Sequence, residues 1–247
     1  MKLFKIFLCA AFAAITLTSC LGDDDTENTY TAYGYYTIVG SQTTGYTLYS
    51  DTGGKVIPSS TSVYDVTGGH GFGNHTRALF YFNYKPSQVS QDQSTITGAD
   101  LYDGRYFDEL KPLSLAEAET ALVNSTDSVF QYQSLVDAWA YRGYLNTVVN
   151  GQYSQVNTVS IMPTVNLVYD PASITDNSIT FDIYYNRHTA QDAAAYGPVN
   201  LYTSYFLDDL DALIPGSGDV RVILRGKDGA TKMLTVSRQN FHKGNYE

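Results

Sequence analysis

The chain has 247 residues, of which 15 are basic and 25 acidic, and its formal net charge is −10 at pH 7. This excess of acid argues against nucleic acid as a partner, because such binding depends on neutralising phosphates with Lys and Arg. The length is sufficient for one large domain or two small ones with hydrophobic cores of their own.

The first residues have the pattern of a secretory signal. Lys2 and Lys5 precede an apolar run over residues 6–17, which is shorter than the roughly 20 residues that span a bilayer. A secreted protein cleaved elsewhere, or a short buried helix, is the alternative. Residues 17–20 (LTSC) resemble the lipobox of bacterial lipoproteins, in which the cysteine thiol receives a diacylglycerol. We therefore expect residues 1–19 to be a signal peptide and Cys20 to be the lipid attachment site.

The residues after Cys20 are acidic and polar. Asp23, Asp24 and Asp25 resemble the surface-export signal of Bacteroidetes lipoproteins, which sends them to the outer face of the outer membrane. A solvated linker is the compatible simpler interpretation, because the segment has no apolar period. We expect residues 20–30 to form an acidic tether and the protein to lie at the outer membrane, facing the cell surface.

Composition restricts the chemistry of the mature chain. Cys9 leaves with the signal and Cys20 carries lipid, so neither a disulfide nor a thiol nucleophile remains. The 22 tyrosines are explained most simply by a β-rich protein, and a tyrosine-bearing face that binds carbohydrate or protein is the alternative. Residues 21–123 carry 5 basic and 13 acidic side chains against 8 and 12 in residues 124–247, which predicts that the acidity lies mostly in the tethered half.

Strand signals dominate the first half of the mature chain. Segments rich in β-branched and aromatic residues occur at 35–39, 46–49, 55–57, 76–84 and 96–106. A Gly-rich turn at residues 51–54 predicts a hairpin, and Gly98 and Gly104 predict bulges or bends. Short, glycine-broken strands of this kind are typical of a small OB-like β-barrel. We place the barrel, together with a linking helix, over residues 31–123.

The second half begins after a helix signal. Ser114 and Glu117 form a capping box, which predicts a short linking helix ending near Asn124. Strand signals then resume at residues 139–149, 159–169, 179–185, 199–206, 220–224 and 233–236. Their alternation and regular turns predict an antiparallel, Ig-like β-sandwich over residues 124–247.

Residues 68–75 (GGHGFGNH) are the most unusual local segment. His70 and His75, beside Asp65, offer side chains that bind metals. Metal ligands need neighbours that hold them in place, however, and the glycines leave the backbone free. We therefore expect no metal here but an exposed, mobile loop, with His70, Phe72 and His75 as candidate binding residues.

Other short motifs are better explained by turns. Residues 51–53 (DTG) match the aspartic-protease triplet, but the second triplet that such a site requires is missing. Residues 208–211 (DDLD) lack the spacing of a calcium loop, and His188 has no nucleophile near it in sequence. Neither a Gly-x-Ser-x-Gly elbow nor a phosphate-binding loop occurs. We expect no catalytic residue and no cofactor, and therefore no enzyme. Residues 127–129 (DSV) resemble an O-glycosylation acceptor of Bacteroidetes.

Taken together, these features resemble the NigD-like lipoproteins of Bacteroidetes. Besides the lipobox and the tether, the resemblance is carried by residues 48–54 (LYSDTGG), Arg77 opening a long strand, residues 143–146 (GYLN) and residues 185–188 (YNRH). It implies an N-terminal OB-like domain, a C-terminal β-sandwich and no established enzymatic activity. The family takes its name from a bacteriocin gene cluster, which suggests immunity by association.

The sequence thus predicts a lipid-anchored envelope protein that binds or interacts without catalysis. The expected partners are the membrane, through the lipid, and a protein or glycan ligand, but no nucleic acid. Three alternatives stay open: a glycan-binding accessory protein of a polysaccharide uptake system, a fimbrial structural subunit, and a bacteriocin immunity protein.

Overall fold

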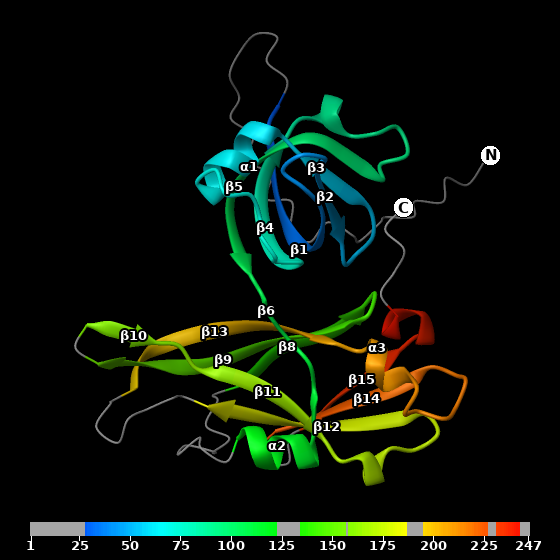
Figure 1. The fold of residues 1–247 in the computed structure, drawn as a ribbon. Coiled ribbons are helices and arrows are strands. Elements are labelled where there is room, and N and C mark those ends of the chain that lie inside the picture. The colour runs from blue at the N-terminus through cyan, green and yellow to red at the C-terminus, as the bar shows by residue number, and fades with distance from the viewer. Residues whose placement is uncertain (1–27, 123–133, 157, 187–194, 227–230, 243–247) are drawn as a thin grey trace, which may run out of the picture. The chain divides into compact units, whose positions relative to one another are not determined.

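The computed structural model (Figure 1) describes residues 28–122, 134–156, 158–186, 195–226 and 231–242. The chain forms two compact units, which divide between Tyr106 and Phe107. Cys20 and the three aspartates of the expected export signal lie outside the described residues, as do residues 127–129 and His188. In the part of the chain that is described, no helix has the length and apolarity needed to cross a membrane.

The first unit is a closed barrel. Its strands are β1 (Tyr30–Ser41), β2 (Gly45–Ser50), β3 (Lys55–Pro58), β4 (Arg77–Tyr84) and β5 (Thr95–Tyr106). They follow one another around the barrel in the order β1-β2-β3-β5-β4. β3 runs parallel to β5, and the other neighbours are antiparallel. The predicted OB-like barrel is confirmed. The short 3-10 helix η1 (Pro86–Gln88) lies between β4 and β5.

The predicted hairpin and bulge are both present in the barrel. Leu48 pairs with Val56 across β2 and β3, and the turn between them has Gly53 and Gly54 at φ values of 100° and 79°. Such positive φ angles are accessible to glycine at little cost. The register of β3 and β5 shifts between Ile57 and Pro58, which pair with Thr97 and Ala99, so the irregularity falls at the predicted Gly98. A second shift, between β4 and β5, falls at Tyr102 rather than at Gly104.

A helix that the sequence analysis did not predict, α1 (Ser60–Thr67), connects β3 to β4. The Ser59 hydroxyl accepts a hydrogen bond from the Ser62 amide, and Gly68 ends the helix in the left-handed conformation at φ 59°. The helix is rich in Ser, Thr and Val, which have modest helix propensity. Its existence therefore depends on the two caps and on burial of Val63 in the barrel core.

The second unit consists of two sheets. One contains β6 (Asp108–Leu110), β8 (Ser134–Tyr141), β9 (Tyr144–Val156), β10 (Val159–Ile161) and β13 (Ala195–Phe206). The other contains β7 (Leu113–Ser114), β11 (Thr164–Tyr169), β12 (Ser178–Asn186), β14 (Val220–Arg225) and β15 (Thr231–Val236). The helical elements are α2 (Leu115–Ala121), α3 (Asp208–Asp211), η2 (Pro171–Ser173) and η3 (Arg238–Phe241). The predicted β-sandwich is confirmed, although β6–β13, β7–β11 and β12–β14 are parallel pairs.

The division between the units lies earlier than the expected boundary at residue 123. β6 pairs with β13 and β7 pairs with β11, so the segment from Phe107 onward belongs to the sandwich. The capping box that predicted α2 is present, because the Ser114 hydroxyl accepts from the Glu117 amide while the Glu117 carboxylate accepts from the Ser114 amide. The helix therefore belongs to the second unit rather than ending the first.

Two expected strands of the sandwich are each divided in two. Residues 139–149 span the end of β8 and the start of β9, with Arg142 and Gly143 at φ values of 46° and 86°. Positive φ at both central residues is the geometry of a two-residue hairpin turn. Residues 159–169 are divided between β10 and β11, and Pro163, which lacks the amide proton of a ladder, lies between them.

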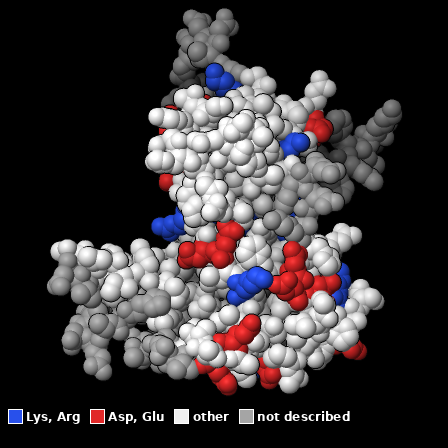
Figure 2. All heavy atoms as spheres, viewed as in Figure 1, with Lys and Arg blue, Asp and Glu red and all other residues white. Residues whose placement is uncertain are grey.

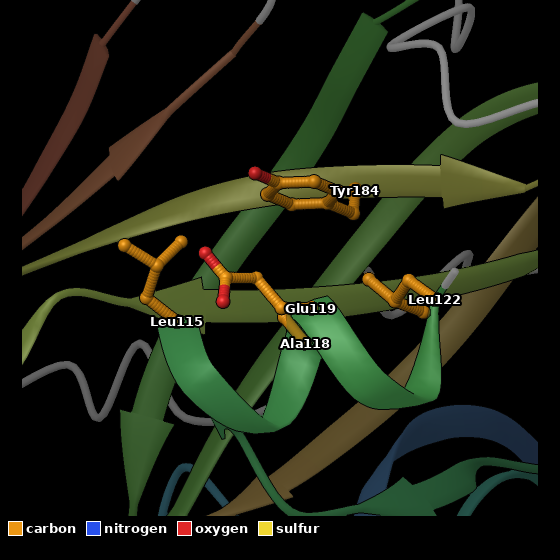
Figure 3. Close-up of a pocket in the computed structure, with 5 residues that line it drawn as sticks. All are labelled: Leu115, Ala118, Glu119, Leu122 and Tyr184. Atoms are coloured by element: carbon orange, nitrogen blue, oxygen red, sulfur yellow. The ribbon is translucent and has the colours of Figure 1, made fainter.

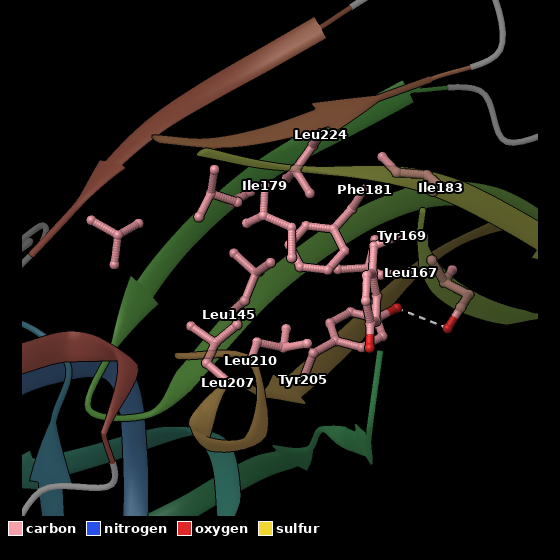
Figure 4. Packing of buried hydrophobic residues seen from close by; sticks show 14 of the residues in the cluster. Leu145, Leu167, Tyr169, Ile179, Phe181, Ile183, Tyr205, Leu207, Leu210 and Leu224 are labelled. Carbon is pink, nitrogen blue, oxygen red and sulfur yellow. Dashed lines mark hydrogen bonds between the residues drawn. The ribbon is translucent and has the colours of Figure 1, made fainter. Parts of the chain in front are cut away.

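Apolar side chains from both sheets fill the interior of the sandwich (Figure 4). Leu145, Phe181 and Leu224 are fully buried there. Tyr205 is also fully buried, and its hydroxyl donates a hydrogen bond to the Val165 carbonyl at 2.8 Å, so this polar group has a partner. Burial raises the pKa of Tyr205 above its ordinary value.

Candidate functional site

A hollow of about 370 Å³ opens on the barrel. It is formed by the β1–β2 connection, the start of β2, the end of β3 and one face of α1, through Gln42, Gly45, Tyr46, Ile57, Pro58, Ser60, Val63 and Tyr64. Small-molecule sites have volumes of roughly 300–1,000 Å³, so this hollow fits a small ligand. We call it the barrel hollow.

The glycine-rich loop over residues 68–75 supports the two tyrosines of the barrel hollow. A Cβ atom on Gly69 would lie 2.7 Å from Tyr64 Cε2, and one on Gly71 would lie 2.5 Å from the Tyr46 hydroxyl. Gln42 Nε2 donates to the Gly69 carbonyl at 2.7 Å. The unusual glycine content of this loop is thus explained by close packing against aromatic rings, not only by freedom of the backbone.

The three candidate residues of the loop have different environments. Phe72 is 1% exposed and packs against Tyr46 and Phe80, with ring centroids 4.6 and 5.1 Å away. It therefore belongs to the barrel core, which corrects its expected place on an exposed binding surface. His70 is exposed, and His75 stacks on Tyr106 at 4.0 Å. Among the described residues, no group of three His, Cys, Asp or Glu side chains is placed to hold a metal ion.

Gln42, Ser60 and Tyr64 of the hollow were not predicted from the sequence. Ser60 and Tyr64 are four residues apart on α1, so they lie on one face of that helix. The signal for this face was the pair of caps at Ser59 and Gly68, which defines the helix and with it the position of Tyr64. Gln42 comes from a separate connection, and only the closed barrel brings it near them.

Charge is nearly balanced on the barrel. Between residues 28 and 106 the acidic residues are Asp51, Asp65, Asp92, Asp100 and Asp103, and the basic ones are Lys55, Arg77, Lys85 and Arg105. The face seen in Figure 2 accordingly carries few charged side chains over this unit. The surplus acid of residues 21–123 therefore belongs to residues 23–27 and 108–119, not to the barrel.

The protease-like triplet is structural. Asp51 accepts two hydrogen bonds from Arg77, at 2.6 Å from Nη1 and 2.5 Å from Nη2, and Arg77 Nη1 also donates to Thr37 Oγ1 at 2.8 Å. The Arg77 and Asp51 side chains are 0% and 3% exposed. This bidentate ion pair gives each buried charge a partner in the interior. It also joins the β2–β3 turn to the start of β4, the first two segments on which the family resemblance depends.

A second aromatic feature lies on the barrel strands. Tyr33 of β1 stacks on Tyr81 of β4 at 5.5 Å, and Tyr81 lies 6.1 Å from Tyr102 of β5. Tyr102 is 51% exposed. We call these three residues the tyrosine ladder. It corresponds to the tyrosine-bearing face considered from composition, but it does not line the barrel hollow.

A smaller hollow, of about 190 Å³, lies on the sandwich (Figure 3). It is lined by Leu115, Ala118 and Glu119 of α2, by Leu122 directly after that helix, and by Tyr184 of β12. The side chains of Leu115, Glu119 and Leu122 point from the helix toward Tyr184 (Figure 3). Its walls are mainly aliphatic, so it offers a ligand little besides apolar contact.

No family model matches the chain, and no curated protein matches it. Solved structures with the same fold include a candidate toxin-related protein from Parabacteroides distasonis, which is 17% identical, with a TM-score of 0.56 over 85% of this chain and 95% of that one. A candidate lipoprotein from Bacteroides fragilis is 11% identical, with a TM-score of 0.54 over 88% and 99% of the two chains.

A NigD-like immunity protein from Bacteroides caccae is 16% identical, with a TM-score of 0.52 over 86% of this chain and 94% of that one. At these identities the likeness establishes the fold. The expected resemblance to NigD-like proteins is therefore confirmed as a shared fold. None of the three names denotes an enzyme.

Proposed function

We propose that this protein is a lipid-anchored lipoprotein of the bacterial outer membrane, displayed at the cell surface, which binds a ligand without catalysis. The barrel hollow, with its glycine-supported tyrosines, is the observation that carries the binding role. The LTSC segment at residues 17–20 and the shared fold with a candidate lipoprotein support the anchor.

The chemistry of the hollow favours binding over catalysis. Its lining residues include no carboxylate, imidazole, thiol or amine, and its titratable groups are the two tyrosine hydroxyls. A serine or tyrosine hydroxyl acts as a nucleophile only when an adjacent base or a lowered pKa activates it, and no lining residue supplies a carboxylate or imidazole base. The nearly balanced charge of the barrel likewise favours a ligand other than nucleic acid, since single-stranded nucleic acids are bound in positively charged grooves.

The anchor and the surface display can be tested separately in intact cells. Metabolic labelling with a fatty acid should mark the full-length protein, and a Cys20→Ala variant should lose the label. Replacing Asp23, Asp24 and Asp25 with Ala should preserve the lipid but abolish labelling by a membrane-impermeant reagent. The anchor proposal fails if Cys20→Ala retains the fatty acid, and the display proposal fails if the triple variant is labelled like the natural protein.

A bacteriocin immunity role is the second candidate, because one structure with this fold is named an immunity protein and another a toxin-related protein. It predicts that deleting the gene sensitises cells to a toxin from a neighbouring strain, and that the natural gene restores resistance. Equal sensitivity of the deletion and parent strains, across toxins active on the parent's relatives, would contradict it.

A further inference from the structure

Tyr64 has the position of a stacking platform in the barrel hollow. The residue is 65% exposed, and it lies on a helix that is capped at both ends. The ring lies so close to the Gly69 backbone that a Cβ there would be 2.7 Å from Cε2. Glycine thus supports an exposed aromatic ring whose polar hydroxyl and apolar body can both contact a ligand.

The polar groups that line the hollow together with Tyr64 provide both hydrogen-bond donors and acceptors. Gln42 uses Nε2 on the Gly69 carbonyl, which leaves its Oε1 as an acceptor with no partner among the described residues. The Ser60 hydroxyl likewise has no partner in the described part of the chain. The Tyr46 hydroxyl accepts from the Phe72 amide at 3.3 Å and retains its own proton to donate.

The hollow contains no charge. None of its lining residues is ionised at neutral pH, so it offers no counter-ion to a phosphate, a carboxylate or an amine. Burying a charged ligand group without a partner is costly, and a neutral ligand avoids this cost. Ile57, Pro58 and Val63 supply apolar wall beside the polar groups. A neutral molecule with hydroxyls on its edges and C–H groups on its faces matches this surface.

We infer that the barrel hollow binds a neutral sugar residue of a glycan, which stacks on Tyr64 and exchanges hydrogen bonds with Gln42, Tyr46 and Ser60. This inference rests on the proposed binding function and names the class of ligand. The volume of about 370 Å³ limits the bound part to a short terminal unit, with the remainder of the glycan outside.

The test uses the full-length protein purified from membranes in mild detergent and a panel of oligosaccharides. The panel contains neutral glycans ending in glucose, galactose or mannose, and acidic glycans ending in sialic or uronic acid. Neutral glycans should bind and acidic ones should not. Tyr64→Ala should weaken the best neutral binder at least tenfold, while Tyr64→Phe should preserve most of the affinity.

Tyr102→Ala is the matched control, because Tyr102 is also an exposed barrel tyrosine but belongs to the tyrosine ladder. It should change the affinity less than twofold. Gly69→Ala should also weaken binding, because its Cβ displaces the Tyr64 ring while the Gly69 carbonyl that accepts from Gln42 is kept. Far-UV circular dichroism of each variant distinguishes lost binding from lost folding.

The inference is overturned if Tyr64→Ala binds like the natural protein, if Tyr102→Ala removes binding instead, or if only acidic glycans bind. A panel with no binder also overturns it, and leaves the anchoring result at Cys20 as the independent test of the proposed function. If no glycan of the panel binds but a protein ligand binds in a manner that depends on Tyr64, the sugar inference is refuted and the proposed binding function is supported.

Discussion

The barrel and the sandwich bury polar groups in different ways. The barrel encloses a complete ion pair between Arg77 and Asp51, with both side chains nearly inaccessible. In the sandwich, the pair between Arg225 and Asp182 lies at the surface, with 54% and 29% of the two side chains exposed. Its interior combines apolar side chains from two sheets with buried polar side chains that are neutral, such as Ser204, whose hydroxyl donates to Asn146 Oδ1 at 2.6 Å. The barrel thus fixes its loops by specific polar contacts, which is what a binding surface requires.

The largest difference is expected from removing one member of each ion pair. Asp51→Ala leaves the Arg77 charge buried without a partner and should cost roughly 3–5 kcal/mol of barrel stability. Asp182→Ala removes an exposed pair and should cost less than about 1 kcal/mol. Urea unfolding followed by far-UV circular dichroism measures both changes.

The single tryptophan separates the units in the same experiment. Trp139 lies on β8, so its fluorescence reports the sandwich. Asp51→Ala should move the circular dichroism transition of the barrel and leave the Trp139 transition nearly in place. A cost below about 1 kcal/mol for Asp51→Ala would contradict a structural role for the buried pair.

Phe72→Ala tests whether the glycine-rich loop belongs to the barrel core. Deleting a buried Phe ring costs roughly 3–5 kcal/mol, and we expect the lower part of this range because a loop can partly close the cavity. His70→Ala, in the same loop but exposed, should stay within about 0.5 kcal/mol. Equal small effects from both substitutions would place Phe72 outside the core.

Each unit also has a capped helix, and the two caps should contribute similarly. Ser59→Ala in the barrel and Ser114→Ala in the sandwich each remove a hydroxyl that accepts from a helix amide. Each should cost about 1 kcal/mol, and a Gly at either position should cost only a few tenths. If thermal unfolding shows a loss of stability for only one of the two Ser→Ala variants, the helix of the other variant is stabilised by packing and not by its cap.

Alkaline pH should lower the free energy of unfolding of both units, whereas neutral pH should leave it unchanged in both. Burial raises the pKa of Tyr36 in the barrel and of Tyr205 in the sandwich above the ordinary value of 10.0. As the pH rises through about 10, the unfolded chain loses these protons before the folded chain does. Stability is therefore full below this pH and falls above it. Urea unfolding between pH 8 and 11 measures this loss of stability. The loss should be smaller in the Tyr36→Phe variant and in the Tyr205→Phe variant than in the natural protein.

Segments rich in β-branched and aromatic residues, broken by glycines, were sufficient to predict the barrel, and alternation with regular turns was sufficient to predict the sandwich. The two-residue turn at Arg142 was missed because arginine rarely adopts positive φ, and α1 was missed because only its caps indicate a helix. The hollow could not be predicted, since Gln42 and Tyr64 meet only in the closed barrel. Phe72 was placed in the right loop, but its burial depends on Tyr46, 26 residues away in sequence, and on Phe80 of the following strand β4.

The central claim is that the barrel hollow, and Tyr64 within it, is where this protein binds its ligand. Nitration of exposed tyrosines, located by mass spectrometry, tests it directly on the full-length protein with and without the best neutral glycan of the panel. Tyr64 and Tyr102 should both react in the free protein, as their exposures of 65% and 51% predict. The glycan should protect Tyr64 and leave Tyr102 reactive. Protection of Tyr102 with Tyr64 unchanged would contradict the account.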